Sequence, residues 1–365
     1  MVLMENYRIL VINPGSTSTK VSYHINKECI FKADVFHDSG ELLKFGSIND
    51  QLDYRMEMLE AFLAEHDIHE LDAVVGRGGG CYSVESGTYY VDEQLIKDTR
   101  EYKGGLYHSS MLGVQMAERV QKMMGGVMLM VDPPVVDELD MKARITGVKG
   151  IYRTAICHAL NLKEVAKVHA RSMGKNYEDL NLIVCHIDGG ISVTAHRKGR
   201  MIDGNDAGGG QGPFTPTRMG SMSVTDVINK LKDHDYDQIK VLCSQGGGLS
   251  SHFGTSNSTL LHERMENGDE EVRIVWEAMI YQVCKEIGSM AAVLKGQVDG
   301  IVLTGGLLRF PEIEATIVEH CGFIAPVTSY EGEMEHEAMA NNAYLVLTGQ
   351  LEAKKYPGKP VFSGQ

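Results

Sequence analysis

The chain has 365 residues, enough for two domains of ordinary size, and 43% of them are hydrophobic, which is typical of a globular protein. No apolar run could span a membrane, no secretion signal is visible, and the seven scattered cysteines lack a Cys-x-x-Cys pair, so we expect a cytoplasmic protein with reduced thiols and no zinc site. The formal net charge of −14 argues against nucleic acid and anionic membranes as partners, but not against a small anionic substrate that meets local cations.

The first predicted element is a buried strand over residues 8–12, which runs into a turn rich in hydroxyl groups. Residues 13–15 (Asn-Pro-Gly) are turn chemistry, and residues 16–20 (Ser-Thr-Ser-Thr-Lys) add hydroxyls, backbone N–H groups and one cation before a strand resumes. Such a turn can hold a cluster of anionic oxygens, although an ordinary Ser/Thr-rich hairpin has the same composition. It is not a P-loop, because Lys20 stands where that motif requires its second glycine and a strand follows in place of a helix.

Strands and helices alternate through the rest of the N-terminal half. The predicted elements are two strands within residues 20–36, a helix over 51–66, a strand over 73–75 that enters the glycine run 76–80, a helix over 109–124, a strand over 127–131 and a helix over 162–173. We expect Asn161 to cap the last of these helices and Gly174 to end it.

The opening pattern returns in the second half of the chain. A strand over residues 182–187, the turn 188–190 (Asp-Gly-Gly) and strands over 191–195 and 201–203 predict an internal duplication of strand, glycine turn and strand. Residues 204–220 are glycine-rich and are predicted to form a long functional loop.

Further elements follow to the C-terminus. They are helices over 224–232, 260–266 and 270–294, a strand over 300–306, a helix over 311–321, a strand over 323–327 and a helix over 336–348, followed by a weakly ordered tail from residue 352. This alternation predicts an α/β protein, and three strands before each first helix predict mixed sheets.

Four glycine turns end buried strands, and in open α/β sheets ligands collect beyond the strand ends. Arg77 and Arg218 lie in such glycine-rich segments and are either surface arginines or forked clamps on a carboxylate or phosphoryl group. His186 ends a buried strand and is either a core residue or a catalyst. Asp132, before two prolines, is a Mg²⁺ or water ligand, or a cap.

A series of motifs, in order along nearly the whole chain, resembles the acetate and butyrate kinases of the acetokinase family. These motifs lie at residues 11–20, 75–79, 131–138, 157–161, 189–200, 212–214, 277–279 and 303–306. The resemblance implies an α/β fold in which a duplicated βββαβα core forms two ribonuclease-H-like domains, with a nucleotide cleft between them. The expected domains are residues 1–155 with about 338–365, on the acid and phosphoryl side, and residues 156–337, which would bind ATP.

The resemblance also implies an activity: reversible phosphoryl transfer between ATP and butyrate or a branched short-chain acid, which gives ADP and an acyl phosphate. Mg²⁺ would assist, and the expected assembly is a homodimer or higher homo-oligomer. Because a carboxylate is already ionised at neutral pH, this chemistry needs positioning and charge neutralisation but no general base.

The resemblance assigns roles by position. The implied catalytic residues are Arg77 and Arg218 as clamps, His186 as a transition-state stabiliser, Asp132, and His108 as a supporting residue. The implied binding residues are Asn13, Ser16, Ser18 and Lys20 near the transferred phosphoryl group, Gly189, Gly190 and Ser192 near the ATP phosphates, and Thr304, Gly305 and Gly306 near the adenosine. The implied Mg²⁺ ligands are Asp132, Glu337 and Asn13.

Three residues depart from the family pattern: Asp188 replaces a glycine, Met111 an asparagine and Gln211 a glutamate. They leave open a non-catalytic or altered-substrate nucleotide-binding paralogue of the same fold, and an actin-like or chaperone-like ATPase is the other alternative class. The triple glycine 78–80 is expected to leave room for an acid longer than acetate.

Overall fold

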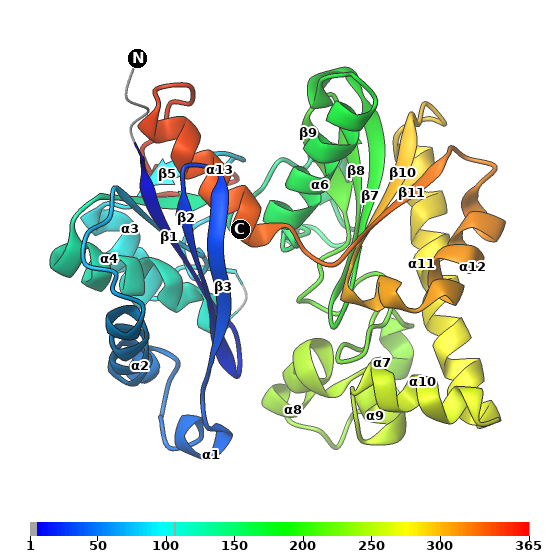
Figure 1. The fold of residues 1–365 in the computed structure, drawn as a ribbon. Helices are drawn as coiled ribbons and strands as arrows, with labels where there is room; N and C mark the ends of the chain where they lie inside the picture. The colour runs from blue at the N-terminus through cyan, green and yellow to red at the C-terminus, as the bar shows by residue number, and fades with distance from the viewer. Residues whose placement is uncertain (1–5, 106, 365) are drawn as a thin grey trace. The chain divides into compact units, whose positions relative to one another are not determined.

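The computed structural model describes residues 6–105 and 107–364, which form two compact units (Figure 1). Unit 1 comprises the chain up to Asp137 together with the segment from Met334 onward, and unit 2 comprises Glu138–Glu333. The first division falls earlier than the expected residue 155, because Glu138 is already tied to unit 2. Its carboxylate pairs with Lys163 at 2.8 Å and accepts the backbone N–H of Met201 at 2.9 Å.

Unit 1 is built on a six-stranded mixed sheet with the order β3-β2-β1-β4-β6-β5. The strands are β1 (Arg8–Pro14), β2 (Ser18–Ile25), β3 (Glu28–Phe36), β4 (Ala73–Gly76), β5 (Thr88–Tyr90) and β6 (Val127–Val131). Strands β1 to β3 form an antiparallel meander, β4 and β6 run parallel to β1, and β5 closes the edge antiparallel to β6.

Helices cover both faces of this sheet. Leu10 and Ile12 of β1 pack in one core cluster with residues of α2 and α4. Ile9 and Val11 are also fully buried and, because side chains alternate along a strand, face the opposite side, where α13 contacts β1, β4 and β6. The helices of unit 1 are α1 (Ser39–Leu42), α2 (Leu52–Glu65), α3 (Glu93–Arg100), α4 (Leu112–Met124) and α13 (Glu335–Leu347).

Unit 2 is built on a five-stranded mixed sheet with the order β11-β10-β7-β8-β9. Its strands are β7 (Asn181–Ile187), β8 (Ile191–Arg197), β9 (Arg200–Gly204), β10 (Gly300–Gly305) and β11 (Val327–Glu331). One face packs against the long helix α11 and against α12, and α6 lies along β7 and β10 (Figure 1). The helices are α5 (Met141–Arg144), α6 (Ala159–Ser172), α7 (Val224–Lys230), α8 (Tyr236–Val241), α9 (Leu249–Phe253), α10 (Ser258–Glu266), α11 (Glu270–Val293) and α12 (Pro311–Cys321).

The two units repeat one another, as the returning sequence pattern predicts. Each has a three-stranded antiparallel meander followed by two strands that run parallel to its first strand. The correspondence reaches individual residues, because each second strand has a β-bulge beside a buried histidine, His24 or His196. In each unit this histidine is hydrogen-bonded to the hydroxyl group two residues before it in the chain. His24 bonds Ser22 at 2.9 Å, and His196 bonds Thr194 at 2.8 Å.

Three expectations about local structure are wrong. Asn161 is not a cap: α6 begins at Ala159, and Asn161 lies inside the helix with no exposed surface. The strand expected over 323–327 begins only at Val327, because Pro326 has no N–H with which to extend the ladder. The tail is ordered, since Tyr356 is buried and its hydroxyl donates to Asp98 at 3.0 Å.

The short elements β5, α3, α8 and α9 were not predicted. All seven cysteines lie within the described ranges, and none of them is in a disulfide bond there. Within the described ranges, no helix combines the length and apolar character needed to cross a membrane.

Candidate active site

The opening turn of unit 1 is held between two paired strands. Pairing of β1 with β2 sets Asn13 opposite Lys20, and the turn closes with a bond from Gly15 N to Ser18 O at 2.7 Å. Arg77 follows β4, beside the end of β1, and its N–H donates to Ile12 O at 2.9 Å. The predicted residues at the ends of β1 and β4 are therefore neighbours.

A buried arginine that was not predicted supports this turn. Arg55 of α2 has no exposed surface, and its guanidinium donates to Ser16 O at 3.2 Å and to Gln51 Oε1 at 3.0 Å. It also donates to Thr19 Oγ1 at 3.3 Å. Burial lowers the pKa of Arg55 to about 10, which still leaves a cation beneath the turn at neutral pH.

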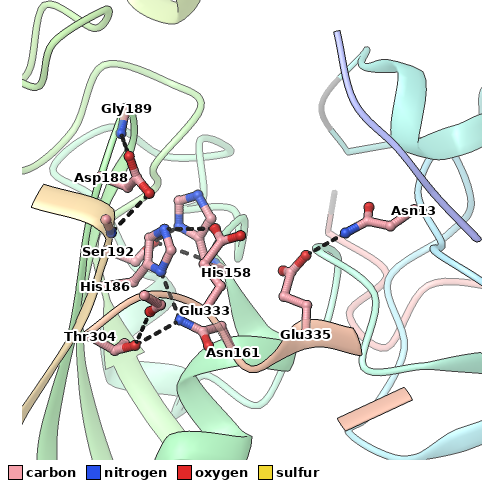
Figure 2. A network of polar contacts seen from close by, with 12 residues as sticks. Asn13, His158, Asn161, His186, Asp188, Gly189, Ser192, Thr304, Glu333 and Glu335 are labelled. Carbon is pink, nitrogen blue, oxygen red and sulfur yellow. Dashed lines mark hydrogen bonds and ion pairs between the residues drawn. The ribbon is translucent and has the colours of Figure 1, made fainter. Parts of the chain in front are cut away.

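Asn13 and Arg77 meet at one carboxylate, that of Glu335 at the start of α13. Glu335 Oε2 accepts from Asn13 Nδ2 at 2.8 Å (Figure 2), and Oε1 accepts from Arg77 at 3.1 Å. The side chains of Arg77 and Glu335 are only 5% and 11% exposed. This pair is a buried, charge-assisted contact, and Glu335 was not predicted.

Glu337, the glutamate predicted for the metal, lies elsewhere on the same helix. Its side chain is 48% exposed and pairs with Lys32 of β3 at 3.9 Å. Its assignment to Mg²⁺ stays a prediction, but Glu335 is the glutamate that contacts Asn13.

Asp132 follows β6 and contributes through both its side chain and its backbone. Its Oδ1 accepts from Ser86 Oγ at 2.7 Å and from Gly87 N at 2.8 Å, and its backbone oxygen accepts from Arg77 at 3.2 Å. Its φ of 36° is unusual for a residue with a side chain, and such strain gathers at functional sites. Asp132 thus orients Arg77.

His108 approaches the opening turn from the start of a short 3₁₀ helix, Ser109–Met111. Its Nδ1 accepts the N–H of Ser110 at 3.1 Å, so a neutral ring carries its proton on Nε2, which lies 3.3 Å from Ser16 Oγ. The ring is therefore oriented to donate toward Ser16.

The triple glycine does not leave the expected room. A Cβ on Gly78 would lie 2.2 Å from Met130 Sδ, and one on Gly80 would lie 3.1 Å from Met111 Cβ. The space beside these glycines is filled by the two methionines, so the steric argument for a longer acid is wrong.

In unit 2 the turn between β7 and β8 is bridged to the end of β10 by Asp188. Its Oδ1 accepts from Gly189 N at 2.8 Å (Figure 2), and its Oδ2 accepts from Gly306 N at 3.0 Å. Asp188, which departs from the family pattern, thus accepts hydrogen bonds from backbone N–H groups of two glycine turns. Thr215 and Thr217 hold the same turn from the loop, through Gly189 O at 2.7 and 3.1 Å.

Two glycines here lie at close approaches. A Cβ on Gly190 would lie 2.2 Å from a guanidinium nitrogen of Arg218, so the arginine packs directly on this turn. Burial lowers the pKa of Arg218, and the nearby Asp206 carboxylate opposes that shift. Gly305 has a φ of +113°, and a Cβ there would lie 2.3 Å from Ile187 O.

His186, at the end of β7, lies in a cluster of polar side chains (Figure 2). Its Nδ1 lies 2.9 Å from Asn161 Nδ2, its Nε2 lies 3.8 Å from a carboxylate oxygen of Glu333, and its ring stacks on His158 at 4.0 Å. The predicted Ser192 lies behind this stack, with its hydroxyl 2.8 Å from His158 Nδ1.

Ligand atoms of His186, Asp188 and Glu333 lie within 4.8 Å of one another, close enough for a metal ion. The predicted Thr304 lies 3.2 Å from Asn161 Nδ2, the atom that also contacts His186. Unit 2 therefore gathers most of the residues that the sequence assigned to ATP.

Sequence reasoning missed several residues of these networks, among them Arg55, His158, Asn161, Glu333 and Glu335. Three of these carried a signal. Arg55 falls on the apolar face of its helix, where an arginine needs buried partners, and His158 lies within a motif shared with the family. Asn161 lies in the same motif, whereas Glu333 and Glu335 carried no signal that separates them from neighbouring polar residues.

Two solved structures have a fold similar to that of this chain. The acetate kinase of Porphyromonas gingivalis superposes with a TM-score of 0.75 at 17% identity, over 93% of this chain and all of that one. The acetate kinase of Entamoeba histolytica gives 0.73 at 14% identity, over 94% of this chain and 99% of that one. The chain therefore has the acetate kinase fold, with two mixed α/β sheets.

Sequence comparison is more specific. A probable butyrate kinase of Coprothermobacter proteolyticus is 42% identical over 356 residues, which cover 96% of this chain and 99% of that protein. A probable butyrate kinase of Enterococcus faecalis is 39% identical over 350 residues, 95% of this chain and 97% of that protein. The acetokinase family model matches residues 145–327. The chain belongs to the acetokinase family.

Proposed function

We propose that the protein is a short-chain carboxylic acid kinase that transfers a phosphoryl group reversibly between ATP and butyrate, or a branched short-chain acid. Similarity over nearly the full length to two probable butyrate kinases supports this substrate class. The structural observation that carries the proposal is the buried network of Asn13, Arg77 and Glu335 at the strand ends of unit 1.

Unit 1 suits the acid and the transferred phosphoryl group. Arg77 presents a guanidinium that is oriented by Asp132 O and Glu335, and guanidinium geometry matches carboxylate and phosphoryl oxygens. Lys20 stands across the hairpin from Asn13 and adds a point charge. Phosphoryl transfer to an ionised carboxylate needs this kind of charge neutralisation.

Mg²⁺ fits the donor set of unit 1. It prefers carboxylate and amide oxygens. Asn13 Nδ2 donates to the Glu335 carboxylate, so the side chain that carries the amide oxygen lies beside that carboxylate, and the Asp132 carboxylate follows β6. We propose these three residues as the protein groups that hold Mg²⁺, with Glu335 in the place first given to Glu337. Bound Mg²⁺ would neutralise charge on the phosphoryl oxygens.

Unit 2 suits the nucleotide. Gly189 and Gly190 end β7, Thr304 to Gly306 end β10, and backbone N–H groups in glycine turns bind phosphate. His186 and its stacked neighbour His158 supply ring N–H groups beside these turns. Arg218 adds a cation that packs on Gly190.

Asp188 supports a second candidate, a nucleotide-binding paralogue with an altered substrate. Its carboxylate already accepts the N–H groups of Gly189 and Gly306, which an ATP phosphate would otherwise use. Calorimetry and an acyl phosphate assay together separate the two candidates, because such a paralogue binds ATP in calorimetry but forms no acyl phosphate from butyrate or its branched analogues.

The homo-oligomeric state stays a prediction, which sedimentation would test.

The test is ADP formation and hydroxamate trapping across acetate, propionate, butyrate, isobutyrate and valerate. We expect a preference for butyrate or a branched acid, and Arg77→Ala should lower kcat/KM by about 10³-fold. Arg119→Ala is the matched control, because Arg119 is 47% exposed and pairs only with an exposed Asp53 in the hydrogen bonds described for it. Equal activity of Arg77→Ala and wild type, or a clear preference for acetate, would refute the proposal.

A further inference from the structure

We propose that Asn161 is a positioning residue that sets the tautomer of His186, so that the ring presents an N–H at Nε2 to phosphoryl oxygens. The use of this donor in phosphoryl transfer rests on the kinase function proposed above. The tautomer itself rests on the hydrogen bonds within unit 2.

The argument begins at Thr304, whose hydroxyl hydrogen is already used. Thr304 Oγ1 donates to the backbone oxygen of Gly332 at 2.8 Å, and a carbonyl oxygen can only accept. A hydroxyl has a single hydrogen, so Thr304 can only accept from the Asn161 side chain, which lies 3.2 Å away. The amide group that faces Thr304 is therefore NH₂, because the amide oxygen would meet another oxygen with no proton between them.

The same NH₂ group of Asn161 lies 2.9 Å from His186 Nδ1. A donor at that distance requires a lone pair on Nδ1, so the proton of the neutral ring resides on Nε2. Asn161 has no exposed surface and sits inside α6, which prevents the amide from rotating toward water. The tautomer of His186 is thus set by a chain of three side chains on β10, α6 and β7.

The groups around His186 Nε2 indicate what its N–H would bind. A carboxylate oxygen of Glu333 lies 3.8 Å away, and Asp188, at the glycine turn assigned to ATP phosphates, lies in the same group of side chains. An N–H at Nε2 can bond anionic oxygen there, whereas a metal ion would need the lone pair. The tautomer therefore favours a hydrogen-bond donor over a metal ligand at this nitrogen.

Asn161→Asp is the variant that inverts the arrangement without changing its shape. A carboxylate can only accept, so it should draw a proton to Nδ1 of His186. Asn257→Asp is the matched control, because Asn257 is an exposed N-cap of α10, a position that aspartate fills equally well.

The direct readout is the ¹⁵N chemical shift of both ring nitrogens of His186, in protein labelled on its 14 histidines and assigned with His186→Gln. At a pH above the ordinary imidazole pKa, we expect wild type and Asn257→Asp to carry the proton on Nε2. Asn161→Asp should carry it on Nδ1. A wild-type proton on Nδ1 would overturn the proposal, even if the variant did not fold.

The kinetic readout tests the role of the donor. We expect Asn161→Asp to lower kcat about 10²-fold, with the KM for the acid changed less than about threefold, because the lost bond belongs to the transition state. An unchanged kcat together with an inverted tautomer would refute the positioning role. If wild type formed no acyl phosphate from any acid, the proposed function would fail, while the ¹⁵N shifts would still decide the tautomer.

Discussion

Two glutamates on one helix, Glu335 and Glu337, allow the sharpest test of the site in unit 1. Replacing each with glutamine keeps the shape of the side chain and removes one charge. Glu335 accepts from Asn13 at 2.8 Å and from Arg77 at 3.1 Å, and it is 11% exposed. Glu337 is 48% exposed and lies 3.9 Å from Lys32.

The expected cost of each substitution follows from burial. Glu335→Gln leaves the Arg77 charge buried without its counter-charge, which costs about 3 kcal/mol, near the lower end for a broken buried pair because the amide oxygen still accepts. Glu337→Gln breaks an exposed pair and should cost less than about 1 kcal/mol. In catalysis, Glu335→Gln should lower kcat at least 10²-fold, or about 2.7 kcal/mol in barrier, and Glu337→Gln less than about threefold.

The assay combines urea unfolding with acyl phosphate formation at varied Mg²⁺ concentration. Far-UV circular dichroism reports both units, whereas fluorescence of Trp276, the single tryptophan, reports unit 2 alone. Glu335→Gln should shift the dichroism transition and raise the Mg²⁺ concentration needed for half-maximal activity. The reasoning would be refuted if Glu337→Gln were as damaging as Glu335→Gln, or if Glu335→Gln matched wild type in both measurements.

Three further predictions follow from other buried contacts. Asp188→Gly frees the N–H of Gly306 and removes a negative charge, so it should tighten ATP binding about tenfold in calorimetry; weaker binding would contradict this. Arg55→Met should lower kcat/KM at least tenfold while thermal unfolding stays cooperative, because the opening turn loses its support; wild-type kinetics would exclude that role. Burial lowers the pKa of His336 to about 3 in the folded protein, whereas the unfolded chain keeps the ordinary value of 6.5. As the pH falls below about 6.5, the unfolded chain takes up a proton that the folded protein does not, so the folded protein loses stability. By about pH 5 wild type should therefore lose roughly 2 kcal/mol more than His336→Gln in urea titrations, and the exposed His234→Gln should behave as wild type.

The sequence by itself determined the order of the elements and their repetition. Strands such as β6 and helices such as α12 were predicted at their observed bounds, because apolar periodicity, proline and glycine act locally. Local signals failed where a local breaker was overlooked, as at Pro326, or where a polar residue had a distant partner, as at Asn161.

The family motifs likewise predicted turns that lie at strand ends of one sheet: Asn13 is near the end of β1, Arg77 follows β4, and Asp132 follows β6. Only the tertiary structure decided which side chains meet at those turns. Glu335 is 322 residues from Asn13 and 258 from Arg77, and no sequence spacing encodes such a contact. Side chains two apart on a helix point in nearly opposite directions, so Glu335 and Glu337 cannot both face the sheet. Packing of α13 against β1, β4 and β6 selects Glu335, because a buried guanidinium needs a counter-charge and only the folded sheet determines where it lies.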